Sequence, residues 1–528
     1  ASTGTSRRRG GALMRLASLV TLGAVTAGAS ALGACTLGPD FRSPDAPRTN
    51  RYLADDQPSQ LVSAGIPGGE AQQIVQNLDI PGQWWGVFQS RPLNGLIENA
   101  LVANPDIRAA SASLRVAQFN ARAQRATLFP TVQAGFAAAQ NQTSSDLSAP
   151  TAAGSFIYGL FTAGLTITYT LDLFGANRRA IESLDALAEA QCFQLEAVYL
   201  SLSSNVVAAA ILEASLRAQI DATKRIIAAQ RETLGILRQQ EGLGAITGAD
   251  VATQEAALAQ AETTLPPLEK ALAQERNLLA TLIGRLPSDR VVERFELTDL
   301  MLPQELPLSL PSRLVEQRPD VRASEANLHS ASAQVGVAIA NQFPQITLSA
   351  GINSQSLSSD MLFGAGLTGS NVGFSVLQTV LDGGALWAKK KAAQAALEQA
   401  DAQYRSTVLT AFRNVADTLR ALEYDAITLT AAVAAERAAA TSFTIARRRL
   451  ELGDTTYVVV LIAELTYQQT LLTRIQAQAN RLTDTAALFQ ALGGGWWNRD
   501  DEISNPAQRL TCRPSKPAGV APRTAALK

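Results

Sequence analysis

The sequence predicts a mostly helical fold with an internal duplication, in which each half contributes long coiled-coil helices and two strands of a transmembrane β-barrel. Three observations predict it: a phrase that occurs twice, alternating segments after each copy, and two long proline-free stretches. The segment at 104–130 recurs in similar form at 318–344. Both copies have Pro-Asp near the start and Phe-Pro at the end. We expect each copy to form one helix of about 22–24 residues.

Segments with a period of two follow each Phe-Pro. Residues 131–139 and 345–353 alternate apolar with small or polar side chains, and 165–173 and 372–381 predict the returning strands. About ten residues suffice for a tilted strand to cross a bilayer. Four strands cannot close a barrel, which needs about eight or more, so several chains must contribute strands to one barrel.

Two proline-free stretches, at about 177–242 and 385–453, predict helices of about 65 residues each, near 100 Å in length. Their apolar residues have coiled-coil spacing, as in Ile220, Ile227 and Leu234. Each stretch ends at a glycine turn, and a returning helix follows at about 250–283 and 458–492. Pro266 and Pro267 predict a kink or break in the first returning helix.

The N-terminal region has the features of an exported lipoprotein. Basic residues, a weakly apolar segment and the lipobox Leu-Gly-Ala-Cys predict a signal peptide over 1–34 and a covalent lipid on Cys35. The alternative is a short membrane anchor with an incidental cysteine. Thr36, in place of the aspartate that retains lipoproteins in the inner membrane, favours the outer membrane. No spacing supports a disulfide, so Cys192 and Cys512 are expected to be unrelated thiols.

Composition and side-chain chemistry exclude other function classes. A net charge of −1 argues against nucleic acid as a partner. The one histidine, His329, aligns with Arg115 in the first copy and is not expected to be catalytic. The sequence contains no Ser/His/Asp, Cys/His or metal-ligand set, so we expect neither an enzyme nor any cofactor beyond the lipid on Cys35.

From Pro39 to Trp497 the chain resembles the outer-membrane factor family, the TolC/OprM-like channels, and most closely its NodT-type lipoproteins of multidrug efflux systems. The resemblance rests on Gly-Pro-Asp-Phe after the lipobox, QWWGVFQSRPLNGLIENALVANPD, the repeated phrase, LDLFG, LDGG and LGGGW. It implies a homotrimer in which four strands per chain complete a 12-stranded barrel, with a periplasmic coiled-coil tunnel and an equatorial belt.

The predicted organisation of the chain follows from the repeat and this resemblance. The segments are a signal peptide (1–34), a lipidated N-terminal segment (35–80), a first repeat (81–285), a Pro-rich inter-repeat equatorial segment (286–318), a second repeat (319–495) and a C-terminal equatorial segment with a disordered tail (496–528).

The resemblance also implies a function: a passive exit duct for drugs or other small molecules in a tripartite efflux system. A periplasmic adaptor and an inner-membrane RND-type pump would be its partners. Gate and adaptor contacts map to the tip turns, at Gly244, Thr247, Asp250, Gly453, Asp454, Thr456 and Tyr457. Val459 and Ile462 stand where relatives often carry aspartate, which favours an apolar constriction.

Other readings of the same residues stay open. Residues 457–465 are also consistent with ordinary coiled-coil core, and Asp250 with a charge at a helix N-terminus. The whole chain could serve as the exit duct of a type I-like secretion system, although the lipobox favours efflux. A structural coiled-coil lipoprotein is the third possibility, but it would not need strands of membrane-spanning length.

Overall fold

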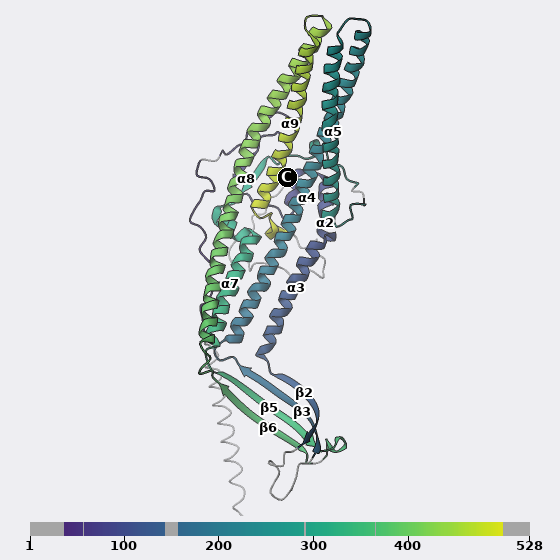
Figure 1. The fold of residues 1–528 in the computed structure, drawn as a ribbon. Helices are drawn as coiled ribbons and strands as arrows, with labels where there is room; N and C mark the ends of the chain where they lie inside the picture. Colours follow the sequence, from purple (N-terminus) through teal and green to yellow (C-terminus); the bar gives the residue numbers. More distant parts are fainter. Residues whose placement is uncertain (1–35, 56–57, 143–156, 290–291, 365, 500–528) are drawn as a thin grey trace, which may run out of the picture. The chain divides into compact units, whose positions relative to one another are not determined.

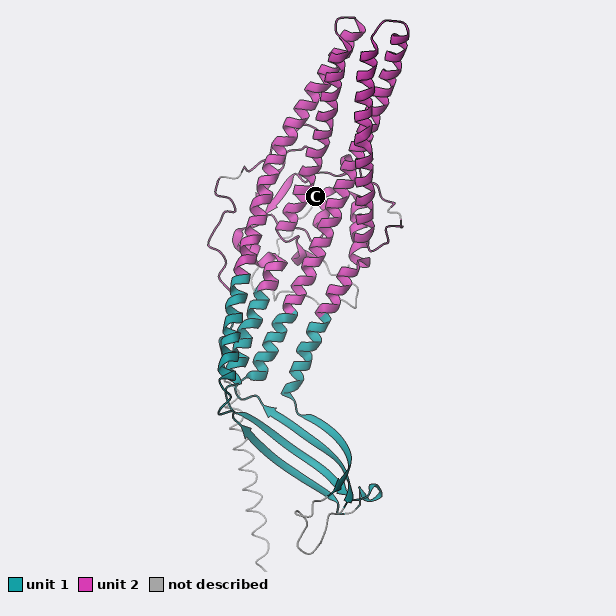
Figure 2. Cartoon of the chain, in the orientation of Figure 1, with its two compact units in different colours: residues 1–43, 115–188, 325–403 teal, residues 44–114, 189–324, 404–528 magenta. Residues whose placement is uncertain are grey.

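A computed structural model of the 528-residue chain describes residues 36–55, 58–142, 157–289, 292–364 and 366–499. The predicted signal peptide, Cys35 and the predicted disordered tail lie outside these residues. The chain forms two compact units (Figure 2): unit 1 contains 1–43, 115–188 and 325–403, and unit 2 contains 44–114, 189–324 and 404–528. Each unit takes segments from both copies of the repeat.

Unit 1 contains one antiparallel sheet (Figure 1) of four strands, β2 (Thr131–Gln142), β3 (Ile157–Leu171), β5 (Gln345–Ser356) and β6 (Thr368–Leu377). The strand order is β2-β3-β5-β6, so the pairing of β3 with β5 joins the two repeats. All four predicted strands are confirmed. β6 ends at Leu377, four residues before the predicted end, near the point where the alternation fails.

The register of the sheet confirms the predicted division into two faces. Apolar residues pair across the strands, as in Val132 with Ile167 and Leu348 with Phe374. Small polar residues pair on the opposite face, as in Thr168 with Ser349. Because side chains alternate with a period of two, one register places every apolar residue on one face. None of the described residues covers the apolar face, and Phe374 is 75% exposed.

The first copy of the repeat gives α3 (Pro105–Arg125), α4 (Ala176–Gly242) and α5 (Gly248–Leu282), preceded by α2 (Arg91–Ala103). The second gives α7 (Pro319–Ala340), α8 (Ala385–Glu451) and α9 (Tyr457–Ala491), preceded by α6 (Pro311–Gln317). α4 and α8 have 67 residues each, which confirms the two long helices. A short parallel pair, β1 (Gln73–Gln76) with β4 (Glu305–Leu308), completes unit 2.

α5 is a single continuous helix through Pro266 and Pro267, so a break at these prolines is not found. Each proline removes one backbone hydrogen bond and disfavours a helix. Buried residues on both sides, including Ala261 and Leu279, hold α5 against its neighbours. Tertiary packing therefore outweighs the local preference.

The returning helices of unit 2 end in the same way in both repeats. Gly284 and Gly493 have φ of +75° and +98°, and an added Cβ would lie 2.7 Å from the carbonyl oxygen of Ala103 or of Gln317. Asn104 donates its side-chain N–H to the Leu282 carbonyl at 2.9 Å in the first repeat. In the second, Arg318 donates to the Ala491 carbonyl at 2.9 Å. The duplication thus preserves the contact while changing the donor.

The QWWGVF and LGGGW motifs meet in the core of unit 2. Trp84, from the QWWGVF motif, is 1% exposed and stacks on Phe489 of α9 with ring centroids 5.6 Å apart. Gly494, from LGGGW, approaches Leu200 so closely that a Cβ would lie 2.3 Å from its Cδ1 atom. LGGGW is therefore a helix end, as predicted, and it is also a packing site that requires glycine.

A buried polar cluster in unit 2 joins the N-terminal segment to α9. Arg481 is fully buried and donates to the Gln72 side chain at 3.3 Å and to the Glu70 carbonyl at 2.6 Å. Burial and a hydrogen bond with Asp484 raise the pKa of Asp425, on α8, to about 7. A carboxylic acid and a guanidinium are thus packed together where α8 and α9 meet the N-terminal segment.

Cys192 of α4 is disulfide-bonded, which corrects the prediction that it is an unrelated thiol. Its partner lies outside the described residues. Sequence spacing could not find this pair, because a disulfide depends on distance in the fold and not along the chain. A disulfide accords with an oxidising compartment.

Candidate functional site

The candidate site is the pair of turns that join α4 to α5 and α8 to α9, all within unit 2 (Figure 1). Gly244 and Gly453 have φ of +74° and +73°, in the left-handed region that favours glycine. The following residues, Ala245 and Asp454, each donate a backbone N–H to a carbonyl five residues earlier, at 2.9 Å. This is the Schellman arrangement, which ends a helix and turns the chain sharply.

The returning helices begin differently in the two turns. The Asp250 carboxylate accepts hydrogen bonds from the backbone N–H of Thr247 at 3.1 Å and from its hydroxyl at 2.8 Å. Asp250 thus belongs to a capping box at the start of α5. Thr456 caps α9, but Val459 occupies the position of the acid, so that helix has no such box. Asp454 instead pairs with Arg449 at 2.8 Å.

The two turns are joined by a direct contact that sequence reasoning missed. The Tyr457 hydroxyl, at the start of α9, donates to the side-chain oxygen of Gln254 on α5. Gln254 is fully buried and donates in turn to the Gln230 carbonyl of α4 at 3.1 Å. Around this bridge lies an apolar cluster of Leu234, Leu237, Val251, Tyr457 and Leu461. The two helical hairpins therefore pack as one body at their turns.

Val459 and Ile462 do not belong to that core. They are 47% and 60% exposed, and with Val458 and Leu465 they form an exposed apolar stripe along the first two turns of α9. The reading of residues 457–465 as coiled-coil core holds for Tyr457, Val460, Leu461 and Ala463, which are buried. The helix thus has a buried seam and a separate apolar face that the described part of the chain leaves uncovered.

A buried acid two turns into α9 was also missed. Glu464 is 7% exposed, accepts a hydrogen bond from Gln468 at 3.3 Å, and has its pKa raised by burial. Tyr457, Leu461, Glu464 and Gln468 follow the alternating four-three spacing of a coiled-coil seam. A charged residue at a seam position was the signal that could have identified it.

The described residues contain no group of three or more His, Cys, Asp or Glu side chains arranged to hold a metal ion. α4 includes a stretch apolar enough to cross a membrane by length and composition, but 56% of that stretch is buried within the chain, as in a core helix. At the tip turns, the helix caps and the Tyr457–Gln254 bridge can hold the helices together. The exposed apolar stripe of α9 can line a passage.

Comparison with known proteins identifies relatives over most of the chain. Residues 96–285 and 310–494 match the family described as outer membrane efflux protein. The chain is 29% identical over 480 residues to the probable efflux pump outer membrane protein TtgC of Pseudomonas putida, covering 89% of this chain and 94% of the relative. It is 28% identical over 417 residues to the pyoverdine export outer membrane protein OpmQ of Pseudomonas aeruginosa, covering 78% and 87%.

Solved channels share the fold. The outer-membrane channel OprN superposes with a TM-score of 0.78 at 27% identity, covering 88% of this chain and all of that one. VceC of Vibrio cholerae gives 0.73 at 26% identity, covering 79% of this chain and 100% of its own. The open state of the Neisseria gonorrhoeae channel MtrE gives 0.75 at 25% identity, covering 88% and 99%.

Proposed function

The chain belongs to the outer membrane efflux protein family, and from that premise we propose that three copies of it form the exit duct of a tripartite pump. It is an outer-membrane channel protein of an efflux system, as its relatives are. The duct itself is passive. An inner-membrane RND-type pump supplies the energy, and a periplasmic adaptor links the pump to this channel.

The open sheet of unit 1 supports an oligomer, and the number three comes from the family resemblance. β2 and β6 are the edge strands, and each is paired on one side only among the described strands. A sheet in a lipid bilayer cannot leave such edges unpaired, because no water is available to bond their N–H and C=O groups. Pairing β6 of one copy with β2 of the next closes the sheet, and three copies give 12 strands.

The tip turns are the proposed gate and the docking surface for the adaptor. The stripe of Val458, Val459, Ile462 and Leu465 is exposed in one chain, so three chains can bring their stripes together. An apolar constriction excludes water and ions when it is narrow, and it needs no charged ring. The Tyr457–Gln254 bridge holds each chain in the arrangement that presents the stripe.

The lipid on Cys35 remains part of this proposal. It adds an anchor in the outer membrane beside the barrel, although a closed barrel is already held there. Intact-mass measurement of the purified mature chain tests it directly. Acylation at residue 35 adds the mass of the lipid to the N-terminal peptide, and an unmodified peptide refutes it.

Photo-crosslinking in live cells tests the docking assignment. A photoreactive residue at Thr247 or Thr456 is expected to capture the adaptor of a proton-driven multidrug pump, whereas the same residue at exposed Thr263, farther along α5, is not. Capture of an adaptor of an ATP-driven secretion system would favour the secretion duct instead. Capture of cell-wall proteins alone would favour a structural lipoprotein.

The oligomer is tested independently by native mass spectrometry of the protein in detergent. The expected mass is three times that of the mature chain, which is below 55.8 kDa for the full sequence once a signal peptide is removed. A monomer or dimer that conducts ions would contradict the trimer. The transported molecules are proposed to be small organic compounds, and the pump rather than the duct would select them.

A further inference from the structure

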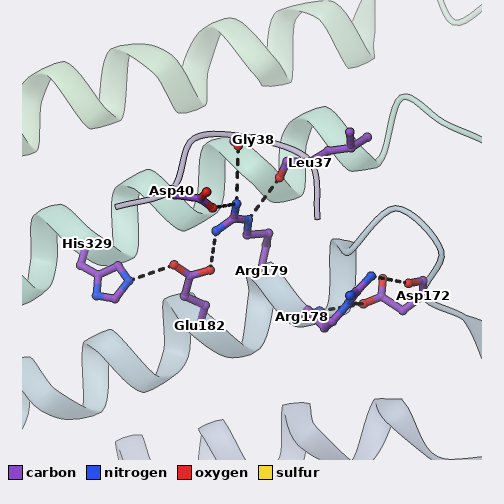
Figure 3. Close-up of polar contacts among 8 residues, drawn as sticks. All are labelled: Leu37, Gly38, Asp40, Asp172, Arg178, Arg179, Glu182 and His329. Carbon is purple, nitrogen blue, oxygen red and sulfur yellow. Dashed lines mark hydrogen bonds and ion pairs between the residues drawn. The ribbon is translucent and has the colours of Figure 1, made fainter. Parts of the chain in front are cut away.

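We propose that a site around Arg179 in unit 1 binds the segment directly after the lipidated cysteine, and that it fixes where the anchor joins the barrel. The segment, Leu37–Phe41, is called the strap here. The site is built by the first turns of α4 and by α7, as Figure 3 shows. The inference about the anchor rests on the proposed lipid at Cys35, whereas the docking of the strap does not.

Arg179 is the centre of the site. It is 4% exposed, and its guanidinium donates to two backbone carbonyls of the strap, Leu37 at 3.2 Å and Gly38 at 3.5 Å (Figure 3). It also forms ion pairs with Asp40 at 2.6 Å and with Glu182 at 2.8 Å. A buried guanidinium is costly unless its donors are bonded. The strap supplies three of the four acceptors described here.

A second contact fixes the end of the strap. The Phe41 ring stacks on the His329 imidazole with centroids 4.3 Å apart and planes 12° apart. His329 Nε2 lies 2.9 Å from Glu182 Oε1, and Glu182 also pairs with Arg179. Asp40, Arg179, Glu182 and His329 therefore form one chain of contacts that extends from the strap across α4 to α7.

Backbone packing shows that the site is shaped for this segment. Gly38 lies over Gly336 of α7, and a Cβ on Gly38 would be 2.4 Å from the Gly336 Cα. A Cβ on Gly336 would lie 2.9 Å from the Leu37 carbonyl oxygen. Only glycine at both positions allows this approach. The site thus accounts for the Gly-Pro-Asp-Phe motif after the lipobox, which the channel function leaves unexplained.

The strap begins at the junction between the barrel and α4. The Leu37 N–H donates to the Phe174 carbonyl at 3.3 Å, and Thr36 packs on Gly175, whose added Cβ would be 3.0 Å from the Thr36 Cα. Phe174 and Gly175 follow the end of β3 by three and four residues. A docked strap therefore holds Thr36 beside the end of β3, which is where the proposed anchor on the preceding residue would join the protein.

Hydrogen exchange of the full-length protein in lipid nanodiscs tests the docking. We expect R179M and D40N to speed exchange in the strap peptide by about tenfold, because each removes a charged partner. R125M is the matched control: Arg125 lies in the same unit and pairs with Asp185 of α4 at 2.7 Å. The Asp40 side chain is 87% exposed, so D40N does not endanger folding. An unchanged strap in both variants, or equal acceleration in R125M, overturns the proposal.

A photoreactive fatty acid fed to cells tests the position of the anchor. Adducts are expected on the peptide that contains residues 171–177 in the wild type and in R125M, and they are expected to fall at least severalfold in R179M. Unchanged adducts in R179M overturn the role in positioning. If no fatty acid is incorporated, the lipid on Cys35 is refuted, while the exchange measurement still decides whether the strap is docked.

Discussion

The hydroxyl of Tyr457, the first residue of α9, donates a hydrogen bond to the side chain of Gln254 on α5. This contact joins residues 203 positions apart that come from the two copies of the duplicated chain. It lies among buried apolar residues, where an unmade hydrogen bond is costly. The turns of the two hairpins are therefore coupled, and moving one without the other must break this bond.

Removal of the Tyr457 hydroxyl is expected to favour the open channel. Y457F leaves Gln254 without its donor and should shift the closed-to-open equilibrium by about 1 kcal/mol, roughly fivefold. Single-channel conductance in planar bilayers measures the open fraction. Y467F is the matched control on the same helix, because Tyr467 stacks on Phe443 through its ring. An equal effect of both variants would rule out the bridge as the cause.

A charge in the apolar stripe is expected to open the channel in a pH-dependent way. I462D places one carboxylate per chain on the exposed face of α9. Carboxylates brought to about 4 Å repel by about 1 kcal/mol per pair even in water. Conductance should therefore rise at pH 7 and return toward the wild-type value near pH 4, where the acids are protonated. A matched I445D variant, at an exposed position of α8, should leave the conductance unchanged at both pH values.

The capping box at the start of α5 is expected to stabilise its turn locally. D250A removes the acceptor of two hydrogen bonds from Thr247 and should cost about 0.5–2 kcal/mol there. Hydrogen exchange at residues 247–253 should accelerate accordingly. D454A is the comparison, since it removes an exposed ion pair with Arg449 that is worth about 0–1 kcal/mol. A larger effect from D454A would contradict this ranking.

Stability near Asp425 is expected to fall as the pH rises through neutrality. Its pKa is about 7 in the folded chain and about 3.9 when unfolded, so between these values the folded state binds more protons. Stability is then highest below the unfolded pKa and is lost as the pH rises toward 7. Partial exposure reduces the effect to about 1–2 kcal/mol. The temperature of the unfolding midpoint should fall as the pH rises from 4 to 7 and change little above that, and the fall should be smaller in D425N.

Much of the fold could be predicted because each element occurs in both copies of the duplicated sequence. Residues 345–353 and 131–139 alternate in the same way, and both form strands whose faces match the prediction. The long helices start and end within about two residues of their predicted limits, because Gly244 and Gly453 leave few other ways to end them. The break predicted at Pro266 and Pro267 was wrong, because the preference of proline against a helix is weaker than the packing of α5 against its neighbours.

The candidate site was predicted in position but not in its contacts. The turns at Gly244 and Gly453 carry local signals, and so does the pairing of Thr247 with Asp250. Gln254 carries none, because its role depends on a tyrosine 203 residues away. The disulfide of Cys192 was missed for the same reason.

The sequence by itself determined the repeat, the strand faces, the helix limits and the family, because periodicity, caps and glycine turns act over a few residues. Only the tertiary structure decided which residues meet across the copies. The joining of β3 to β5, the bridge from Tyr457 to Gln254 and the capture of Asp40 by Arg179 all bring together groups distant in the chain. Such contacts depend on how helices and strands pack as whole bodies, and no local pattern records that packing.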